Sequence, residues 1–334
     1  AQFHRGVALT ALERPLEACA AFDAALALRD DLAIRAARAT ALANLARLDE
    51  ALAEINAALA GSPDKPDYLM RRAYVLNAMD RPTDALADYE RVLAQRPDDA
   101  EAAYGKADAL LSLGDFAHGL EAYEARWRLP GALTMATSSA SEWRGEDLTG
   151  KTLLLIGEQG FGDLFQFCRF APLLTERGAR VIVQERPQTL TLLRSLQGVE
   201  HLVSARDPAP EADFHLYMAG AMRAVGMDIN TIPATIPYLS AEPDRVAQWR
   251  ARLPQRSGKR VGIAWSGIAR QATQRWRSLD DKALQALVSS GADFVSLQME
   301  SSCVLDAAQV LQFGVALKDF ADVAALIETL DLVI

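Results

Sequence analysis

The sequence contains little cysteine, little histidine and few aromatic residues. Its 334 residues include three cysteines and four histidines, and Phe, Trp and Tyr together make up 7%. Cys19, Cys168 and Cys303 follow no metal-ligand or disulfide spacing, and no two histidines stand at ligand spacing. We therefore expect buried thiols, no metal and no catalytic triad.

Long apolar runs and an excess of basic residues are also absent. No run approaches the roughly 20 apolar residues that a membrane-spanning helix needs, and the N-terminus lacks the order of a signal peptide. The 35 Lys and Arg are outnumbered by 44 Asp and Glu, which gives a net charge of −9. Nucleic acids and anionic membranes demand a basic face. The composition therefore argues against both partners and predicts a cytoplasmic globular protein without a transmembrane segment.

Residues 1–128 repeat at a nearly constant period. Small residues recur at Ala18, Ala51, Ala85 and Gly119, separated by 33, 34 and 34 residues, and a larger residue follows four positions later each time. This pattern is similar to that of tetratricopeptide repeats, in which two amphipathic helices approach closely at the small residue. We expect an α-solenoid of about four repeats, the first one incomplete, whose groove holds a peptide or protein.

The pattern changes after residue 128. Residues 129–150 lose the helical period and gain Gly, Ser and Thr, which is typical of a linker. Apolar strands such as "KTLLLIG", "ARVIVQ" and "RVGIAW" then alternate with helical segments, and this alternation predicts parallel sheets covered on both faces. We expect one α/β domain over 151–257 and the start of a second, truncated one over 258–334.

The stretch "GEQGFGDLFQF" at 157–167 follows the first of these strands. Its glycines give G-x-x-G-x-G, which matches neither the dinucleotide-binding turn nor the P-loop. One interpretation makes Asp163 the N-cap of the next helix, with Gln166 closing a capping box. Another is a nicotinamide enzyme in which Glu185, at the end of the second strand, binds a ribose.

Two longer stretches carry a family resemblance. "GEQGFGDLFQFCRFAPLL" with "GARVIVQ", and "VGIAWSGIARQATQRWRSL" with "ADFVSLQ", resemble the heptosyltransferase-like glycosyltransferases, some of which carry N-terminal tetratricopeptide repeats. The resemblance covers nearly all of residues 130–334. It implies a GT-B type fold of two Rossmann-like domains. It also implies inverting sugar transfer from a nucleotide-diphosphate donor, with no metal and no other cofactor.

The family's Gly-Asp pair falls on Gly162 and Asp163. The resemblance implies that Asp163 is the general base for the acceptor hydroxyl, a role in which a positioned carboxylate contributes roughly 10²–10⁴ in rate. The implied acceptor-site loop consists of Gly160, Phe161, Gly162 and Gln166. Its glycines let the backbone approach the substrate without side chains in the way.

Basic residues accumulate on the implied donor side. Nine Lys and Arg and no acid lie between Asp244 and Asp280, and a diphosphate leaving group requires charge-assisted donors. The family pattern places the phosphate-binding residue at Arg275 or Arg277, while Ser266 and Gly267 supply a hydroxyl and backbone N–H groups. "RWRSL" departs from the family's lysine before an aromatic-proline pair, which leaves the choice between the two arginines open.

Several residues near this loop have two interpretations each. Arg245 to Arg256 are expected to form a solvated basic helix face rather than a binding surface. Gln298 ends "ADFVSLQ" at a strand's carboxyl edge, where it either contacts the donor or belongs to a turn. Trp265 is expected in the core, with a sugar platform as the alternative.

Two functions follow from these patterns. The first is a glycosyltransferase that transfers a sugar with inversion to the hydroxyl of a peptide, protein or glycan acceptor recruited by the repeats. The second is a non-catalytic tetratricopeptide adaptor with a degenerate glycosyltransferase-like domain. The chain begins at Ala1 without Met and stops in the apolar "DLVI". We therefore expect a fragment that lacks the family's donor-nucleotide segment and is inactive as given.

Overall fold

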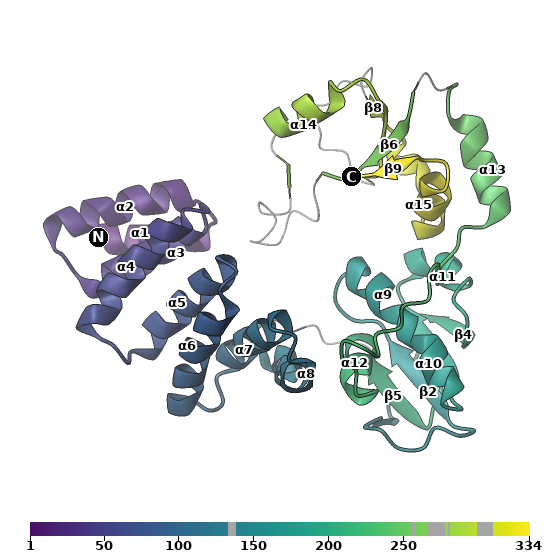
Figure 1. The fold of residues 1–334 in the computed structure, drawn as a ribbon, viewed down its shortest axis with the longest axis horizontal. Helices are drawn as coiled ribbons and strands as arrows, with labels where there is room; N and C mark the ends of the chain where they lie inside the picture. Colours follow the sequence, from purple (N-terminus) through teal and green to yellow (C-terminus); the bar gives the residue numbers. More distant parts are fainter. Residues whose placement is uncertain (133–137, 256–257, 266–277, 280, 299–309) are drawn as a thin grey trace. The chain divides into compact units, whose positions relative to one another are not determined.

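A computed structural model describes residues 1–132, 138–255, 258–265, 278–279, 281–298 and 310–334 of the chain. Within these ranges, a series of paired helices precedes two parallel sheets (Figure 1). The chain divides into two units. The first comprises residues 1–134 together with 222–232, and the second comprises residues 135–221 together with 233–334.

The first unit is built of helix pairs, and successive pairs pack on one another. Its helices are α1 (Gln2–Ala11), α2 (Pro15–Leu28), α3 (Leu32–Ala43), α4 (Leu48–Gly61), α5 (Pro66–Ala78), α6 (Pro82–Gln95), α7 (Ala100–Ser112), α8 (Phe116–Tyr123) and the 3₁₀ helix η1 (Glu124–Arg128). The predicted solenoid of four repeats is confirmed. The first repeat has both of its helices, although α1 has only ten residues.

The small residues of the repeats lie where helices approach each other. Ala18, Ala51 and Ala85 have no exposed surface. A Cβ added to Gly119 of α8 would lie 2.9 Å from the Leu111 side chain of α7, so a larger residue there would force the two helices apart. These close contacts explain why a small residue recurs about every 34 positions in the sequence.

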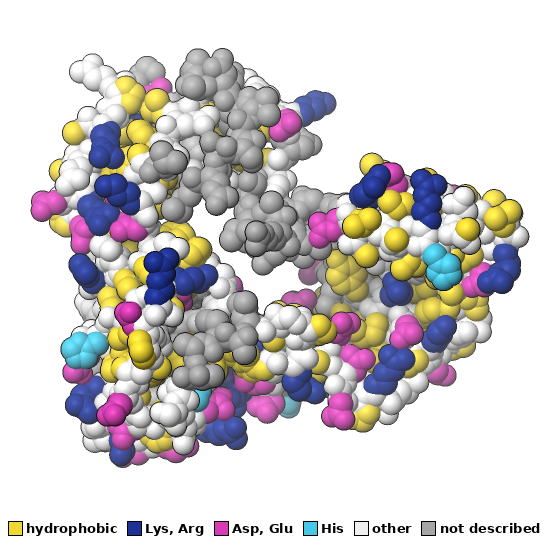
Figure 2. Space-filling model, turned by 180° about the vertical axis from the view of Figure 1, so that it is seen from behind, with side chains coloured by type: hydrophobic (Ala, Val, Ile, Leu, Met, Phe, Trp, Pro, Cys, Tyr) yellow, Lys and Arg dark blue, Asp and Glu magenta, His cyan; other side chains and the backbone are white. Residues whose placement is uncertain are grey.

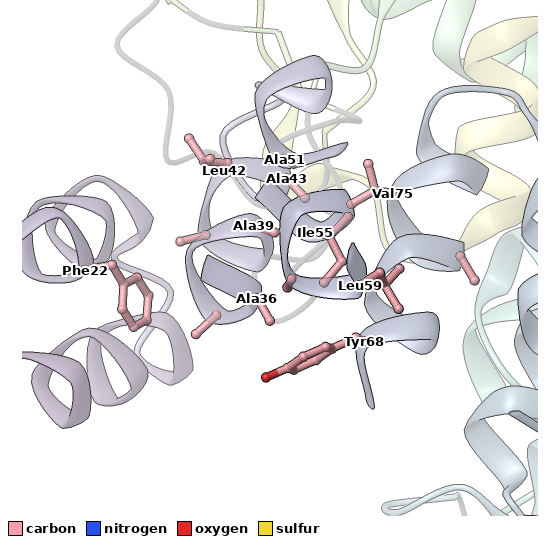
Figure 3. Packing of buried hydrophobic residues seen from close by; sticks show 14 of the residues in the cluster. Phe22, Ala36, Ala39, Leu42, Ala43, Ala51, Ile55, Leu59, Tyr68 and Val75 are labelled. Carbon is pink, nitrogen blue, oxygen red and sulfur yellow. The ribbon is translucent and has the colours of Figure 1, made fainter. Parts of the chain in front are cut away.

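Larger apolar residues fill the space beside the alanines. Figure 3 shows Ala43 of α3 next to Ala51 of α4, with Ile55 and Leu59 directed into the same packed region. Ile55 is completely buried and Leu59 is 5% exposed. Burial of such side chains supplies most of the stability of a repeat stack, because each helix pair covers the apolar face of its neighbour.

The turn inside each repeat has the same left-handed backbone residue. The residue just before the second helix's N-cap has φ of 57° at Glu13, 62° at Ala46, 57° at Asp80 and 81° at Gly114. Only the last of these is a glycine, and the other three adopt a conformation that side chains disfavour. Packing of the helix pairs therefore fixes these turns rather than the preference of the turn residues.

Basic side chains link neighbouring repeats. Arg38, Arg72 and Lys106 are 34 residues apart, and each bonds a polar side chain on the second helix of the preceding repeat. Arg72 also donates two hydrogen bonds of 2.7 Å to Asp88 of its own repeat. Because the Asp88 side chain is only 3% exposed, this ion pair is largely removed from water.

The second unit begins with a five-stranded sheet in the order β1-β5-β2-β3-β4, with all neighbours parallel. Its strands are β1 (Ser141–Glu142), β2 (Thr152–Ile156), β3 (Arg180–Glu185), β4 (Val199–Ser204) and β5 (Phe214–Tyr217). The helices between them are α9 (Phe161–Phe167), η2 (Cys168–Phe170), α10 (Ala171–Glu176), α11 (Pro187–Leu193), η3 (Met218–Gly220) and α12 (Ala221–Ala224).

Two segments depart from the predicted domain bounds. Residues 129–150 are not only a linker, because β1 forms the edge of the sheet and Trp143 beside it is 1% exposed. Residues 222–232 fall outside the predicted 151–257 domain, because they pack with the repeats. There the Nε of Arg223 lies 3.6 Å from a carboxylate oxygen of Glu124.

A second parallel sheet follows, in the order β8-β7-β6-β9. Its strands are β6 (Arg260–Ile263), β7 (Asp293–Ser296), β8 (Val310–Leu311) and β9 (Leu332–Val333). The helices are α13 (Pro243–Arg252), α14 (Asp281–Val288), η5 (Gly314–Ala316) and α15 (Phe320–Ile327). Trp265 is 8% exposed in the core of this sheet, as expected. The predicted parallel α/β architecture after the repeats is therefore present.

The expectation of a solvated Arg245 is wrong. Its guanidinium donates to the carboxylates of Glu242, Asp319 and Asp322, at 2.8 to 3.0 Å. The indole Nε1 of Trp249 also donates to Asp322, at 3.2 Å. This network ties α13 to the start of α15, so Arg245 holds two helices together.

Surface charges of both signs are interspersed. On the face shown in Figure 2, Lys and Arg lie among Asp and Glu over each unit, without a broad field of basic side chains among the described residues. Many of them are paired across one helical turn, for example Arg47 with Glu50.

The Arg72–Asp88 pair leads to a prediction for stability. Arg72→Ala leaves the buried Asp88 carboxylate with only the more distant Arg91, whose Nη1 lies 3.6 Å away, so the free energy of unfolding should fall by about 2 kcal/mol. Arg47→Ala removes an exposed pair with Glu50 and should leave the free energy of unfolding nearly unchanged. Urea denaturation followed by helical circular dichroism measures both values. If the two variants lost the same free energy of unfolding, burial of Asp88 would not explain the contribution of the Arg72–Asp88 pair.

Candidate functional site at the carboxyl edge of the first sheet

The first sheet has a point at which the direction of its connections reverses. From β2 the chain adds β3 and then β4 on one side, and it returns to place β5 on the other side of β2. In open parallel sheets, ligands bind at the carboxyl ends of the two strands that flank such a point. Those ends lead into the glycine-rich loop after β2 and into η3 after β5.

Glu158 connects these two loops. Its side chain is 4% exposed, and its Oε1 accepts a hydrogen bond of 2.9 Å from the backbone N–H of Ala219. Burial, together with the charge of Glu158, raises the pKa of Tyr217, which ends β5. Glu158 therefore fixes the loops on both sides of the reversal point, a role for which its sequence position gives no signal.

Asp163 caps a helix, but not in the predicted manner. Helix α9 begins at Phe161 with Gly160 as its N-cap, so Asp163 is the third residue of the helix. Its Oδ2 accepts a hydrogen bond of 3.0 Å from the backbone N–H of Gly160. The prediction of Asp163 as N-cap with Gln166 closing the box is therefore wrong, and Gln166 is exposed.

The acceptor-site loop is open at one of its glycines. A Cβ added to Gly162 meets no atom within 4 Å, and one added to Gly160 meets only the Asp163 carboxylate at 3.2 Å. Phe161 is half-buried, and its ring lies 4.6 Å from that of Phe320 at the start of α15. The Phe165 ring lies 5.0 Å from Phe320 as well, so α9 and α15 share an aromatic contact.

Glu185 occupies the space beside Gly157 at the start of the loop. A Cβ at Gly157 would lie 1.3 Å from the Glu185 Oε2 atom. The Oε1 atom accepts from the backbone N–H and the Nε of Arg186, at 2.8 and 2.6 Å. The guanidinium of Arg186 in turn lies 3.9 Å from the centre of the Phe161 ring.

This arrangement argues against the nicotinamide alternative. A ribose-binding acid must present a carboxylate oxygen to the ligand. In Glu185, one oxygen is occupied by Arg186, and the other is buried and has no hydrogen-bond partner within the described ranges. Glu185 as a whole is only 2% exposed. It therefore orients Arg186 and the loop and does not bind a ribose.

The implied donor residues lie largely outside the described ranges. Ser266, Gly267, Arg275 and Arg277 all fall within residues 266–277, which the structure does not describe. Gln298 is half-buried two residues after β7, at the carboxyl edge of the second sheet, and its backbone N–H donates to the Ser296 hydroxyl at 3.2 Å. The position of Gln298 is the predicted one, whereas its contact with a donor stays a prediction.

The described histidine, cysteine and acidic side chains do not cluster, and the described cysteines are buried. No group of three or more His, Cys, Asp and Glu side chains in them is arranged to hold a metal ion. Cys19 and Cys168 are buried, as expected, and burial raises the pKa of the Cys168 thiol to about 12. Cys303 lies outside the described residues. None of the described helices is long and apolar enough to cross a membrane.

Comparison with known proteins identifies the repeats. A tetratricopeptide repeat family model matches residues 72–128, which include the third and fourth helix pairs from Arg72 onward. The helical unit is therefore a stack of tetratricopeptide repeats, a module that suggests protein partners.

The chain is similar to one curated protein over nearly its whole length and to solved repeat proteins over part of it. The chain is 28% identical to protein FlbA of Caulobacter vibrioides over 370 residues, covering 98% of this chain and 61% of that protein. It therefore spans about three fifths of that relative's length. A MamA structure from Desulfovibrio magneticus is 23% identical, with a TM-score of 0.35, over 38% of this chain and 72% of MamA. A tetratricopeptide repeat protein from Parabacteroides merdae is 18% identical, with a TM-score of 0.34, over 40% of this chain and 54% of that one.

The contact between Gly157 and Glu185 can be tested by mutation. Gly157→Ala should lower the free energy of unfolding by about 2 kcal/mol, because the new methyl group displaces the buried carboxylate. In combination with Glu185→Ala, part of this loss should be recovered, with a coupling energy of about 1 kcal/mol. Thermal and urea unfolding of the single and double variants measure the coupling.

Gly162→Ala is the matched control in the same loop. It adds a methyl group in open space within the first turn of α9, so stability should stay the same or rise by about 0.5 kcal/mol. Additive effects of Gly157→Ala and Glu185→Ala would contradict the proposed contact.

Proposed function

We propose that the protein is a glycosyltransferase whose repeats recruit the acceptor. In this proposal the α/β unit has the GT-B type fold and transfers a sugar from a nucleotide-diphosphate donor to an acceptor hydroxyl with inversion. The family resemblance of residues 130–334 supports the reaction type. The two parallel sheets after the repeats are compatible with the fold that this resemblance implies.

The position of the Asp163 carboxylate carries the proposal. Its Oδ2 is anchored by the Gly160 N–H, whereas Oδ1 accepts no hydrogen bond from the described residues. The side chain is half-buried at the carboxyl edge of a parallel sheet, beside the open Gly162. One anchored oxygen and one available oxygen suit a general base, because the first fixes the geometry and the second takes the proton.

The donor side of the proposed reaction rests on the sequence. Arg275 or Arg277, with Ser266 and Gly267, would bind the diphosphate and stabilise the negative charge that develops on it. Gln298 lies at the carboxyl edge of β7, where it would face the donor. No metal takes part in this proposal.

The repeats offer a surface for a protein or peptide acceptor. Val7, Thr40, Tyr74 and Asp108 stand on the first helices of the four repeats, separated by 33, 34 and 34 residues. Val7 is 44% exposed and Tyr74 45%. This row of apolar, hydroxyl and carboxylate groups, exposed except at the half-buried Thr40, suits an extended peptide better than a nucleic acid.

An adaptor without activity is the second candidate. The bond between Asp163 and Gly160 gives the carboxylate a structural role that requires no chemistry. In that case the repeats bind a protein partner, and the α/β unit serves as a folded support.

Asp163→Asn separates these candidates. The amide oxygen can still accept from Gly160, but it cannot take a proton, so turnover should fall by roughly 10²–10⁴ while the melting temperature stays the same. Asp163→Ala should also lose the cap, which costs about 1 kcal/mol. The measurement is sugar transfer by the complete gene product over a panel of nucleotide sugars, with Glu176→Gln on α10 as an exposed carboxylate control.

Unchanged turnover in Asp163→Asn would rule out this residue as the base. A complete gene product that binds peptide through its repeats but transfers no sugar from any donor would establish the adaptor.

Tyr74→Ala tests the role of the repeats. Loss of an exposed aromatic contact should raise KM for a protein acceptor about tenfold, as expected for about 1.4 kcal/mol of binding energy. Hydrolysis of the donor in the absence of acceptor should not change. Leu113→Ala removes a side chain of similar exposure, 46%, in a turn between helices and should leave KM unaltered. The same KM in Tyr74→Ala would place acceptor binding elsewhere.

A further inference from the structure

A cavity of about 580 Å³ lies at the amino-terminal edge of the second sheet. Its lining includes Arg250, Pro254, Arg260, Glu328 and Asp331. Arg260 is the first residue of β6, and Asp331 directly precedes β9. The carboxyl ends of these strands, where the proposed donor would bind, are at the opposite edge of the sheet.

Arg260 is the buried charge of this cavity. The residue is only 7% exposed, its backbone N–H donates to Asp331 at 2.8 Å, and its Nη2 donates to the carbonyl of Pro254 at 2.9 Å. Its Nε is buried and has no acceptor among the residues that the structure describes. Within the described part of the chain, no carboxylate lies at ion-pair distance from this guanidinium. A buried cationic donor that lacks an acceptor is unfavourable, so the site has unused capacity to bind an anion.

A second arginine lies on the wall of the same cavity. Arg250, in the last turn of α13, is exposed and forms no ion pair with any described residue. Two guanidinium groups on one cavity wall can share the oxygens of a single oxyanion, because each presents several N–H donors in a plane.

The two acidic residues of the lining, Glu328 and Asp331, weaken the preference of the cavity for an anion but do not reverse it. The Asp331 carboxylate accepts from the Arg260 backbone N–H, which offsets part of its charge. Glu328 is exposed, so solvent and salt screen it. The guanidinium of Arg260 is screened much less because it is buried, and its charge therefore dominates close to its own N–H groups.

We propose that this cavity binds a small oxyanion, a phosphate or a carboxylate, between Arg260 and Arg250. The site is separate from the proposed transfer reaction and does not depend on it. A ligand held here contacts the end of α13, the start of β6 and the residues between α15 and β9, so its binding stabilises the second sheet.

Titration calorimetry of the full chain at low ionic strength tests the proposal, with inorganic phosphate and citrate as separate probes. Arg260→Gln should weaken binding of the preferred anion about tenfold or more, since it removes the charged donors. Glu328→Gln should tighten binding about two- to fivefold, because it removes a competing negative charge. Arg206→Gln, which removes an exposed arginine after β4, should leave affinity unchanged.

The two probes distinguish the source of the oxyanion. Tighter binding of phosphate indicates a phosphorylated ligand, and tighter binding of citrate indicates a carboxylate ligand. No heat with either anion, or equal affinity in wild type and Arg260→Gln, would overturn the proposal. If Arg260→Gln fails to fold by circular dichroism, Arg250→Gln and Glu328→Gln decide the outcome. Arg250→Gln should bind the anion more weakly and Glu328→Gln more tightly. Unchanged affinity in both variants would overturn the proposal.

Discussion

The structure depends on close approaches that only glycine allows at several positions. In the repeats, a Cβ at Gly6 would lie 2.5 Å from the ring of Phe22, and one at Gly105 would lie 2.4 Å from the ring of Tyr89. The same constraint applies in the α/β unit, where Gly157 makes room for the Glu185 carboxylate. Protein interiors are close-packed, so there is no free volume at these positions for an added methyl group. The solenoid and the loop that follows β2 therefore depend on residues that occupy almost no volume.

The candidate site is organised by buried carboxylates rather than by exposed ones. Glu158 holds the loops after β2 and β5 together, and Glu185 holds Arg186 over Phe161. Each carboxylate is nearly inaccessible to solvent and is bonded to groups of the protein itself. Asp163 differs from them, because it is half-buried and its Oδ1 accepts no hydrogen bond from the part of the chain that the structure describes. In the proposed reaction, rigid support from the buried acids would fix the geometry of the half-buried Asp163.

Sequence patterns predicted the elements that obey a strict period. The recurrence of Ala18, Ala51 and Ala85 specified the repeats, and apolar runs specified β2, β3 and β6, because such patterns reflect burial of whole faces. The strand β1 was missed, since two residues beside a single buried Trp143 have no period. The N-cap of α9 was predicted at Asp163, but it is Gly160. Gly160 and Asp163 are three residues apart, as are Asp163 and Gln166, so the sequence spacing fits either pair as a capping box. Only the backbone conformation shows which residue begins the helix. Glu158 and Arg186 gave no signal because their roles come from contacts between separate strands.

The grouping of residues 222–232 with the repeats has a consequence for synthesis and engineering. A ribosome delivers the N-terminus first, and domains generally fold as units while they emerge. The helical stack receives its last contacts, such as Arg223 beside Glu124, only after the whole first sheet has been translated. One segment of the repeat unit, residues 222–232, is therefore translated after the strands of the first sheet. A gene cut at residue 128 would yield a stack with an uncovered final helix, so an independently soluble repeat module requires a redesigned end.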